Sequence, residues 1–234
     1  MNSDEYIVYK GEKFPITNGI LEIPYFGIKD LSEVKGLSDC INLTHLDICD
    51  NNIKELTGLS DLVNLGSLNI SGNPLKEVTG LSNLTKLRSV RAMGCEEIKD
   101  LDGLKDLHEL KFGDSDFQSK NLIREIKGLD HLDKLKYLDF SYNCIEEIQG
   151  LDNLRNLDLL ILNFNNIVEL KGLNNLCNLT TLDLSGNKIS EIKGLENLKK
   201  LRALSLNDNL ITEIKNIEKV REMYKENNLF SICT

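Results

Sequence analysis

Hydrophobic residues recur along the chain with two different spacings inside one repeating segment. In residues 172–193, GLNNLCNLTTLDLSGNKISEIK, leucines recur every three residues from Leu173 to Leu179, and Leu182 and Leu184 then alternate with polar residues. Alternation over a short run predicts a β-strand with one buried face. A spacing of three suits a short 3₁₀-like or helical segment. Each segment therefore predicts one strand and one return segment, which together form a single turn of a coil.

This segment repeats along most of the chain with nearly constant length. Successive glycines of the Gly-Leu pairs that mark the repeats are 22, 22, 23, 25, 22, 22 and 22 residues apart. One turn cannot bury its own apolar face, so consecutive turns must stack. We therefore predict an α/β right-handed solenoid, shaped as a horseshoe, with a parallel β-sheet on its concave face. The marking glycines are Gly36, Gly58, Gly80, Gly103, Gly128, Gly150, Gly172 and Gly194.

An asparagine follows most of the predicted strands, where the chain must bend and leaves backbone groups inside. The amide of Asn187 can both donate hydrogen bonds to the backbone of neighbouring turns and accept them. We therefore assign these residues a structural role and predict no catalytic row. The equivalent residues are Asn51, Asn73, Asn143, Asn165 and Asn209, with Cys95 in place of Asn in one repeat.

Both ends of the array differ from the repeats and are predicted to act as caps. Residues 1–35 form an N-terminal cap with hairpin-like strands at Tyr6–Tyr9 and 16–23, followed by a degenerate repeat with Phe26 in the Asn position. Residues 36–215 form eight repeats, and residues 216–234 form a C-terminal cap that begins with a helix over 216–228. Because each turn packs on the next, we expect one continuous domain.

The repeat from Gly103 to Lys127 carries an insertion. The extra residues lie near 113–119 and are expected to project from the edge of the sheet. A contact loop and a tolerated surface insertion both remain open. Asp114, Ser115 and Asp116 invite a calcium interpretation, but the loop lacks the Gly and the distal Glu of an EF-hand, so we predict no metal site.

Outward-facing strand residues suggest where a partner would bind. Leu159 and Ile161 are apolar at positions where solvent is expected, and Tyr137, Tyr142 and Phe164 lie in the same and the preceding repeat. Aromatic anchors surrounded by polar residues are typical of a binding hot spot. These five residues, called the apolar patch below, are our predicted partner-binding centre. Tolerance of a few apolar residues on a concave face is the alternative.

Charge adds a second feature to the same face. The chain has a net charge of −9, and Asp139 shares one strand position with Asp47 and Asp183. Arg91 and Lys111 are the basic residues predicted on this face, and we include Asp139, Arg91 and Lys111 among the partner-binding residues. An acidic concave face favours a partly basic protein partner and disfavours nucleic acid. A solvated polar face would explain the same charges.

Several classes of function find no support. The chain lacks G-x-S-x-G, a glycine-rich phosphate loop and H-E-x-x-H, so we predict no enzyme, no catalytic residue and no cofactor. Glutamates recur at one repeat position from Glu55 to Glu213, as expected for a solvated face rather than a catalytic acid. Six scattered cysteines suggest small buried thiols in a reducing compartment. With no apolar run long enough for a membrane and no secretory signal, we expect a cytoplasmic monomer.

The repeats resemble a known family. The units ISEIKGLENLKKLRALSLNDN and IKELTGLSDLVNLGSLNISGN are similar to the 22-residue class of leucine-rich repeats, over roughly residues 20 to 215. Within this class they look most like the intracellular regulatory subunits of type-1 protein phosphatase. The resemblance implies a non-catalytic protein-interaction scaffold, with a phosphatase or a small GTPase as partner. No phosphatase-contact residue is carried over.

A second resemblance leads to a different function. Secreted bacterial internalins share the 22-residue repeat length, which implies a surface adhesion protein that binds a host or cell-surface protein. They typically carry Pro where this chain has Gly before the leading Leu, and they are exported.

Overall fold

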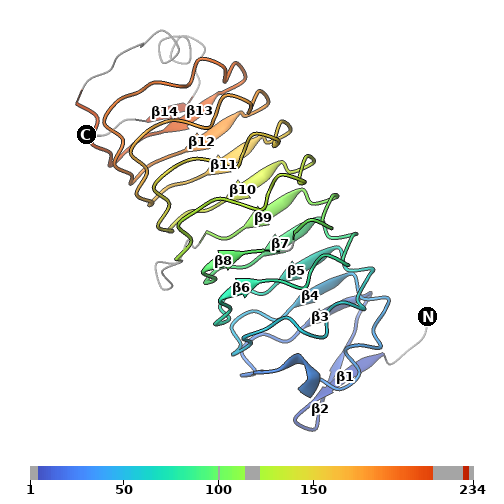
Figure 1. The fold of residues 1–234 in the computed structure, drawn as a ribbon. Helices are drawn as coiled ribbons and strands as arrows, with labels where there is room; N and C mark the ends of the chain where they lie inside the picture. Colours follow the sequence, from blue (N-terminus) through green and yellow to red (C-terminus); the bar gives the residue numbers. More distant parts are fainter. Residues whose placement is uncertain (1–4, 100, 114–121, 213–228, 232–234) are drawn as a thin grey trace.

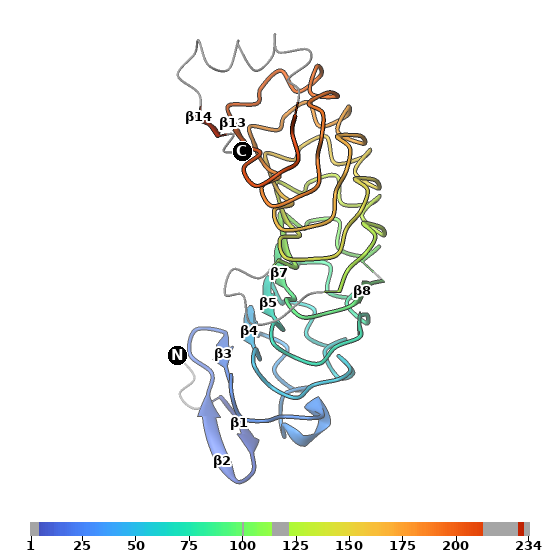
Figure 2. The same ribbon diagram turned by 90° about the vertical axis from the view of Figure 1, so that its left-hand side faces the viewer.

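The computed structural model describes residues 5–99, 101–113, 122–212 and 229–231. It is a solenoid of stacked turns whose long parallel sheet follows the order β14-β13-β12-β11-β10-β9-β7-β5-β4-β3 (Figure 1). The stack is curved, and this sheet lines the inner side of the arc (Figure 2). Its strands are β3 (Ile20–Glu22), β4 (His45–Asp47), β5 (Ser67–Asn69), β7 (Ser89–Arg91), β9 (Glu109–Lys111), β10 (Tyr137–Asp139), β11 (Leu159–Ile161), β12 (Thr181–Asp183), β13 (Ala203–Ser205) and β14 (Leu229–Ser231).

The strands are three residues long because each repeat alternates around one central apolar residue. Leu160 of β11 is fully buried and pairs in register with Leu138 of β10 and Leu182 of β12. The flanking residues point to the concave face. The predicted strand positions and the parallel concave sheet are therefore confirmed.

The return segments on the convex side form turns rather than α-helices. Leu62 donates its N–H to the carbonyl of Leu59, and Leu65 donates to Leu62, a pattern of i→i+3 bonds that recurs from repeat to repeat. In the part of the chain that the structure describes, the one helix is the 3₁₀ helix η1 (Leu31–Glu33). The predicted α/β class is therefore wrong for these residues, because leucines spaced by three favour successive 3₁₀-type turns.

The asparagine ladder forms as predicted. The Asn165 amide donates to the carbonyls of Leu162 at 3.1 Å and of Phe140, one repeat earlier, at 2.8 Å. Its Oδ1 accepts the N–H of Ile145 at 2.9 Å. One buried side chain thus satisfies backbone groups of two consecutive repeats, which explains why this residue type recurs.

The N-terminal cap is partly as predicted. β1 (Tyr6–Tyr9) and β2 (Glu12–Pro15) form an antiparallel hairpin. Residues 20–22, expected to belong to the hairpin, instead form β3 and extend the long sheet. Phe26 takes the Asn position as predicted, and its N–H donates to Asn51 Oδ1 of the next repeat.

The stack is irregular around Pro74 and Cys95. Pro74 lacks the N–H that its equivalent Asn166 donates to Ile145 of the preceding repeat. A Cβ built on Gly80 would lie 3.9 Å from the carbonyl oxygen of Leu56 in the preceding repeat. The equivalent distance from Gly172 to the carbonyl oxygen of Ile148 is 2.2 Å, so the repeats are further apart at Gly80. After Cys95 the chain shifts by one residue, and β6 (Glu77–Val78) pairs with β8 (Glu97–Ile98) in a separate parallel sheet.

The structure does not describe two of the predicted elements. The helical cap at 216–228 and the inserted residues 114–119, with the calcium candidates Asp114, Ser115 and Asp116, lie outside the described residues. The division into residues 1–35, 36–215 and 216–234 stays a prediction.

Candidate functional site

The apolar patch is assembled on two neighbouring strands. Tyr137 pairs with Leu159 and Asp139 pairs with Ile161 between β10 and β11. The side chains of Tyr137, Leu159 and Ile161 are half-buried and project from the concave face. The sheet thus brings together these members of the predicted patch as the sequence pattern indicated.

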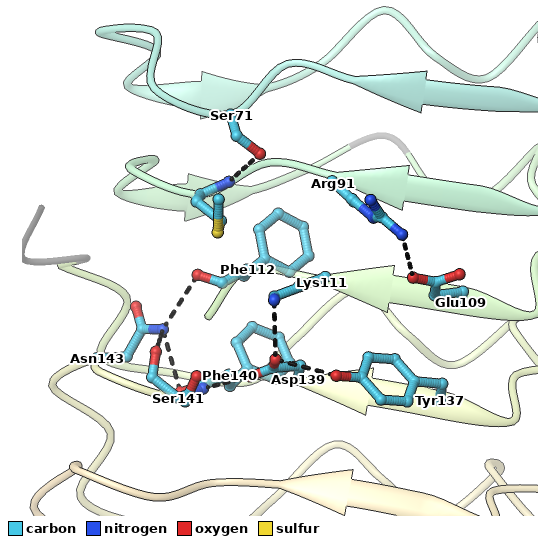
Figure 3. A network of polar contacts seen from close by, with 11 residues as sticks. Ser71, Arg91, Glu109, Lys111, Phe112, Tyr137, Asp139, Phe140, Ser141 and Asn143 are labelled. Carbon is cyan, nitrogen blue, oxygen red and sulfur yellow. Dashed lines mark hydrogen bonds and ion pairs between the residues drawn. The ribbon is translucent and has the colours of Figure 1, made fainter. Parts of the chain in front are cut away.

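Asp139 lies at the centre of a polar network on this face (Figure 3). It is only 4% exposed, and its Oδ1 accepts the Ser141 N–H at 2.9 Å and the Ser141 hydroxyl at 2.7 Å. Its Oδ2 accepts the Tyr137 hydroxyl at 3.2 Å and lies 3.8 Å from Lys111 Nζ. These contacts compensate the burial of the charge. They also hold the Tyr137 ring along the strand, beside Leu159.

The network affects the Tyr137 hydroxyl. Partial burial raises its pKa well above the ordinary value, and the negative charge of Asp139 raises the pKa further. Tyr137 is therefore a neutral hydrogen-bond donor at physiological pH, and its ring contributes apolar surface to the patch.

Asp139 can be buried because the neighbouring repeat has a glycine beside it. A Cβ on Gly113 would lie 2.0 Å from Asp139 Oδ1 and 2.1 Å from Ser141 Oγ. Gly113 itself is buried. The network thus depends on a residue at the start of the predicted insertion.

Most aspartates at the Asp139 position have a structural task. Asp47 accepts the N–H of Cys49, and Asp183 accepts the N–H of Ser185, each two residues further along the chain. Asn69 does the same for Ser71 without a charge. Part of the predicted acidic character therefore reflects backbone satisfaction. Ile161 occupies the equivalent position in β11 but has no acceptor, so its apolar side chain departs from this local role.

The two predicted basic residues are paired with acids on the same face. Arg91 lies opposite Lys111 on adjacent strands, β7 and β9. Arg91 contacts Glu109 at 3.4 Å, and Lys111 contacts Asp139. They border the apolar patch on its N-terminal side as a charge-balanced group, and Arg91 remains exposed.

Tyr142 and Phe164 form a stacked pair at the rim of the sheet, called the aromatic ledge below. Their ring centroids are 4.5 Å apart with an interplanar angle of 18°. Phe164 is 39% exposed. Both residues have a left-handed backbone, with φ of 54° for Tyr142 and 52° for Phe164. Bulky residues rarely adopt this conformation. Among the described residues, Tyr25, directly before Phe26, is the other aromatic residue that does, with φ of 64°.

The rim position explains this backbone. It directly precedes the ladder Asn, where the chain turns, and Gly72 and Gly186 hold it with φ of 65°. A Cβ on Gly186 would lie 2.6 Å from Phe164 Cδ1, so the glycine makes room for the ring. Sequence reasoning missed this strain, although the glycines at the same repeat position carried the signal.

Several ion pairs join repeats outside the strands of the long sheet. Lys99 bridges Glu77 and Glu97, and Lys127 bridges Glu97 and Glu125, so the recurring glutamates join repeats through surface ion pairs. Among the described residues, no group of three or more His, Cys, Asp or Glu side chains is arranged to hold a metal. These residues also contain no helix with the length and apolar character needed to span a membrane.

The cysteines fit the buried-thiol prediction only in part. Cys40 and Cys95 are buried, Cys49 and Cys144 are half-buried, and Cys177 is exposed. Cys177 lies in a return segment between two leucines, where side chains point outward. Cys233 lies outside the described residues.

Comparison with known proteins supports the repeat assignment. The family model for leucine-rich repeats (two copies) matches residues 41–83, 155–197 and 177–219. No curated protein gives a significant sequence match.

Solved structures give the same fold. Internalin C2 from Listeria monocytogenes is 29% identical with a TM-score of 0.69, over 80% of each chain. InlJ from Listeria monocytogenes, described as including a cysteine ladder, is 27% identical with a TM-score of 0.56, over 84% of this chain and 46% of InlJ. The TLR13–ssRNA13 complex matches at 21% identity with a TM-score of 0.68, over 84% of this chain and 29% of TLR13, and shows the fold alone.

Repeat length, parallel register, asparagine ladder and family match agree. Leucine-rich-repeat proteins are generally non-catalytic interaction scaffolds, and their curved sheets offer extended concave surfaces for binding. None of these comparisons supports the specific resemblance to a phosphatase regulatory subunit. The chain thus has the leucine-rich-repeat fold, and its repeats at 41–83 and 155–219 match the leucine-rich-repeat family model.

Proposed function

We propose that the protein is a non-catalytic scaffold that binds another protein on its concave face, centred on the apolar patch. One observation carries this proposal: Ile161 stands where Asp47, Asn69, Asp139 and Asp183 accept a backbone N–H in other repeats. An apolar residue there gives up a local hydrogen bond and leaves apolar surface half-exposed. A bound partner that covers the Ile161 side chain would compensate for this exposed apolar surface.

The identity of the partner belongs to the same proposal. The resemblance of the repeats to phosphatase regulatory subunits makes type-1 protein phosphatase a candidate, with a small GTPase as the next. As a scaffold for such an enzyme, the protein acts in the cytoplasm as a monomer. Arg91, Lys111 and Asp139 contribute polar contacts beside the patch.

A surface adhesion protein of the internalin type is the second candidate. The similarity to internalin C2 over 80% of both chains favours it. The partner would then be a host or cell-surface protein, bound through the same concave face. Finding an export signal in the complete gene would select this candidate over the cytoplasmic scaffold.

Affinity purification with mass spectrometry tests the proposal. We compare the wild-type protein with a Leu159→Asp, Ile161→Asp double variant. The control, Ser67→Asp, Asn69→Asp, changes the equivalent positions of β5, outside the patch, and retains an acceptor for Ser71. Circular dichroism confirms that each variant is folded.

We expect the control to recover the wild-type partner and the patch variant to lose it. Recovery of a phosphatase catalytic subunit would support the regulatory role. Equal recovery by the folded patch variant would exclude the apolar patch as the binding centre.

A further inference from the structure

The rim position before the ladder asparagine requires a left-handed backbone in many repeats. It is held by Gly72, Gly94 and Gly186, and by Asp50 and Asp208, all with positive φ. Glycine adopts this conformation without steric conflict, and Asp tolerates it. Tyr142 and Phe164 therefore occupy positions at which the backbone disfavours them, and the fold itself does not require aromatic residues there.

The two rings are also not part of the core. They stack on each other at the rim, and Phe164 is exposed to 39%. The core below is filled by other residues, such as Leu162 and Phe140, both fully buried. Gly186 leaves the space beside the ring of Phe164 that a Cβ would otherwise occupy. The result is a stacked aromatic pair at the rim of the same two repeats whose strands carry Tyr137, Leu159 and Ile161.

The charge around this surface is predominantly negative. Ile161 lies between Asp139 and Asp183 in the register of the sheet, and Asp208 occupies the rim two repeats beyond Phe164. The nearest basic residue on the sheet, Lys111, already contacts Asp139. With a net charge of −9 for the chain, the field at the ledge favours cations.

We propose that the aromatic ledge binds a flat apolar side chain, aromatic or prolyl, within a basic segment of the partner protein. Such a ring packs on the exposed Phe164 ring in an offset or edge-to-face arrangement. Flanking Lys or Arg residues are attracted by Asp183 and Asp208. This inference rests on the proposed function and specifies the chemistry of the partner.

Short tryptophan peptides test this directly. The chain contains no tryptophan, so the fluorescence of a peptide tryptophan reports only on the peptide. The probes are Lys-Lys-Trp-Lys-Lys, Ser-Ser-Trp-Ser-Ser and Glu-Glu-Trp-Glu-Glu, titrated with the wild-type protein up to millimolar concentration.

We expect a blue shift and saturable binding for the basic peptide, with affinity at least about tenfold weaker for the acidic one. Binding of the basic peptide should weaken with added salt, because exposed charges are screened. No shift with the basic peptide would overturn the proposal. Equal binding of the neutral and basic peptides would overturn its charge component.

Glycine variants assign the binding to the ledge. The double variant Tyr142→Gly, Phe164→Gly removes both rings. Glycine fits this backbone, because Gly72 and Gly186 occupy the equivalent position in other repeats. Asp50→Gly makes the same change at the rim of a distant repeat and is the matched control. We expect at least about tenfold weaker binding of the basic peptide by the double variant and unchanged binding by the control.

Other outcomes identify different occupants. Self-association of the wild-type chain in sedimentation experiments, lost in the double variant, would assign the ledge to a second copy of this chain and overturn the proposal. Unchanged peptide binding by the double variant would also overturn it. If the Leu159→Asp, Ile161→Asp variant nevertheless loses its partner, the proposed function stands without the ledge.

Discussion

Gly113 leaves the space that the carboxylate of Asp139 fills, because a Cβ at residue 113 would lie 2.0 Å from Asp139 Oδ1. The two residues belong to neighbouring repeats and lie beside each other on the concave face. A buried carboxylate is tolerated in a protein only with hydrogen-bond partners. Here it has Ser141, Tyr137 and Lys111, and the glycine allows all of them to approach.

Replacing Gly113 by alanine should therefore destabilise the protein. The methyl group would displace Asp139 or Ser141 from a buried network, and we expect a loss of about 1–3 kcal/mol in the free energy of unfolding. Gly66→Ala is the control, because a Cβ there meets its nearest atom, the Thr44 carbonyl oxygen, at an ordinary 3.5 Å. Urea denaturation measures both. Equal stability of the two variants would contradict the role assigned to Gly113.

The left-handed backbone at Phe164 makes a second prediction. Phe164→Gly loses the ring contact with Tyr142 but relieves a conformation that costs an L-residue about 1–2 kcal/mol. We expect its stability to stay within about 1 kcal/mol of wild type, since glycine also gains entropy in the unfolded chain. Phe164→Val keeps the strain and loses the ring, and should be the less stable variant. Thermal unfolding distinguishes them, and a more stable valine variant would argue against backbone strain at the rim.

The asparagine ladder should respond strongly to a single deletion. Asn165→Ala removes hydrogen bonds to Phe140, Leu162 and Ile145, which are buried. We expect a loss of about 1–3 kcal/mol in unfolding free energy, because these backbone groups lose their partners. Asn156→Ala removes an exposed bond to Asp133 and should change stability by less than about 0.5 kcal/mol. A melting temperature of wild-type value for Asn165→Ala would contradict the ladder.

Cys95 should contribute to the loss of stability at alkaline pH. Burial raises its pKa to about 12, whereas the thiol of an unfolded chain ionises near about 8.5. Above that pH the unfolded state loses a proton that the folded state keeps. The contribution of Cys95 to folding therefore falls as pH rises from about 8.5 to about 12, by up to about 1.4 kcal/mol per pH unit.

The comparison of wild type with Cys95→Ala isolates this effect. Their difference in unfolding free energy should shrink across this pH range. Cys177→Ala provides the control, because it removes an exposed thiol instead of a buried one. Parallel stability curves for wild type and Cys95→Ala would show that residue 95 is accessible to solvent.

The repeating pattern alone determined most of the fold. Strand positions such as Leu159–Ile161, the parallel register and the role of Asn165 follow from local periodicity. Each repeat contains its own strand and turn signals, and stacking identical units leaves a single way to bury the leucines. The same reasoning placed Leu159, Ile161 and Tyr137 on one face.

Only the tertiary structure decided how these residues behave. The ion pair of Asp139 with Lys111, the space provided by Gly113 and the stacking of Tyr142 on Phe164 all join residues of neighbouring repeats that are more than 20 residues apart in the chain. The irregular stacking at Pro74 and Cys95 likewise depends on hydrogen bonds between repeats. Periodicity describes what repeats share, whereas contacts between two particular repeats depend on the size and chemistry of the residues in which they differ.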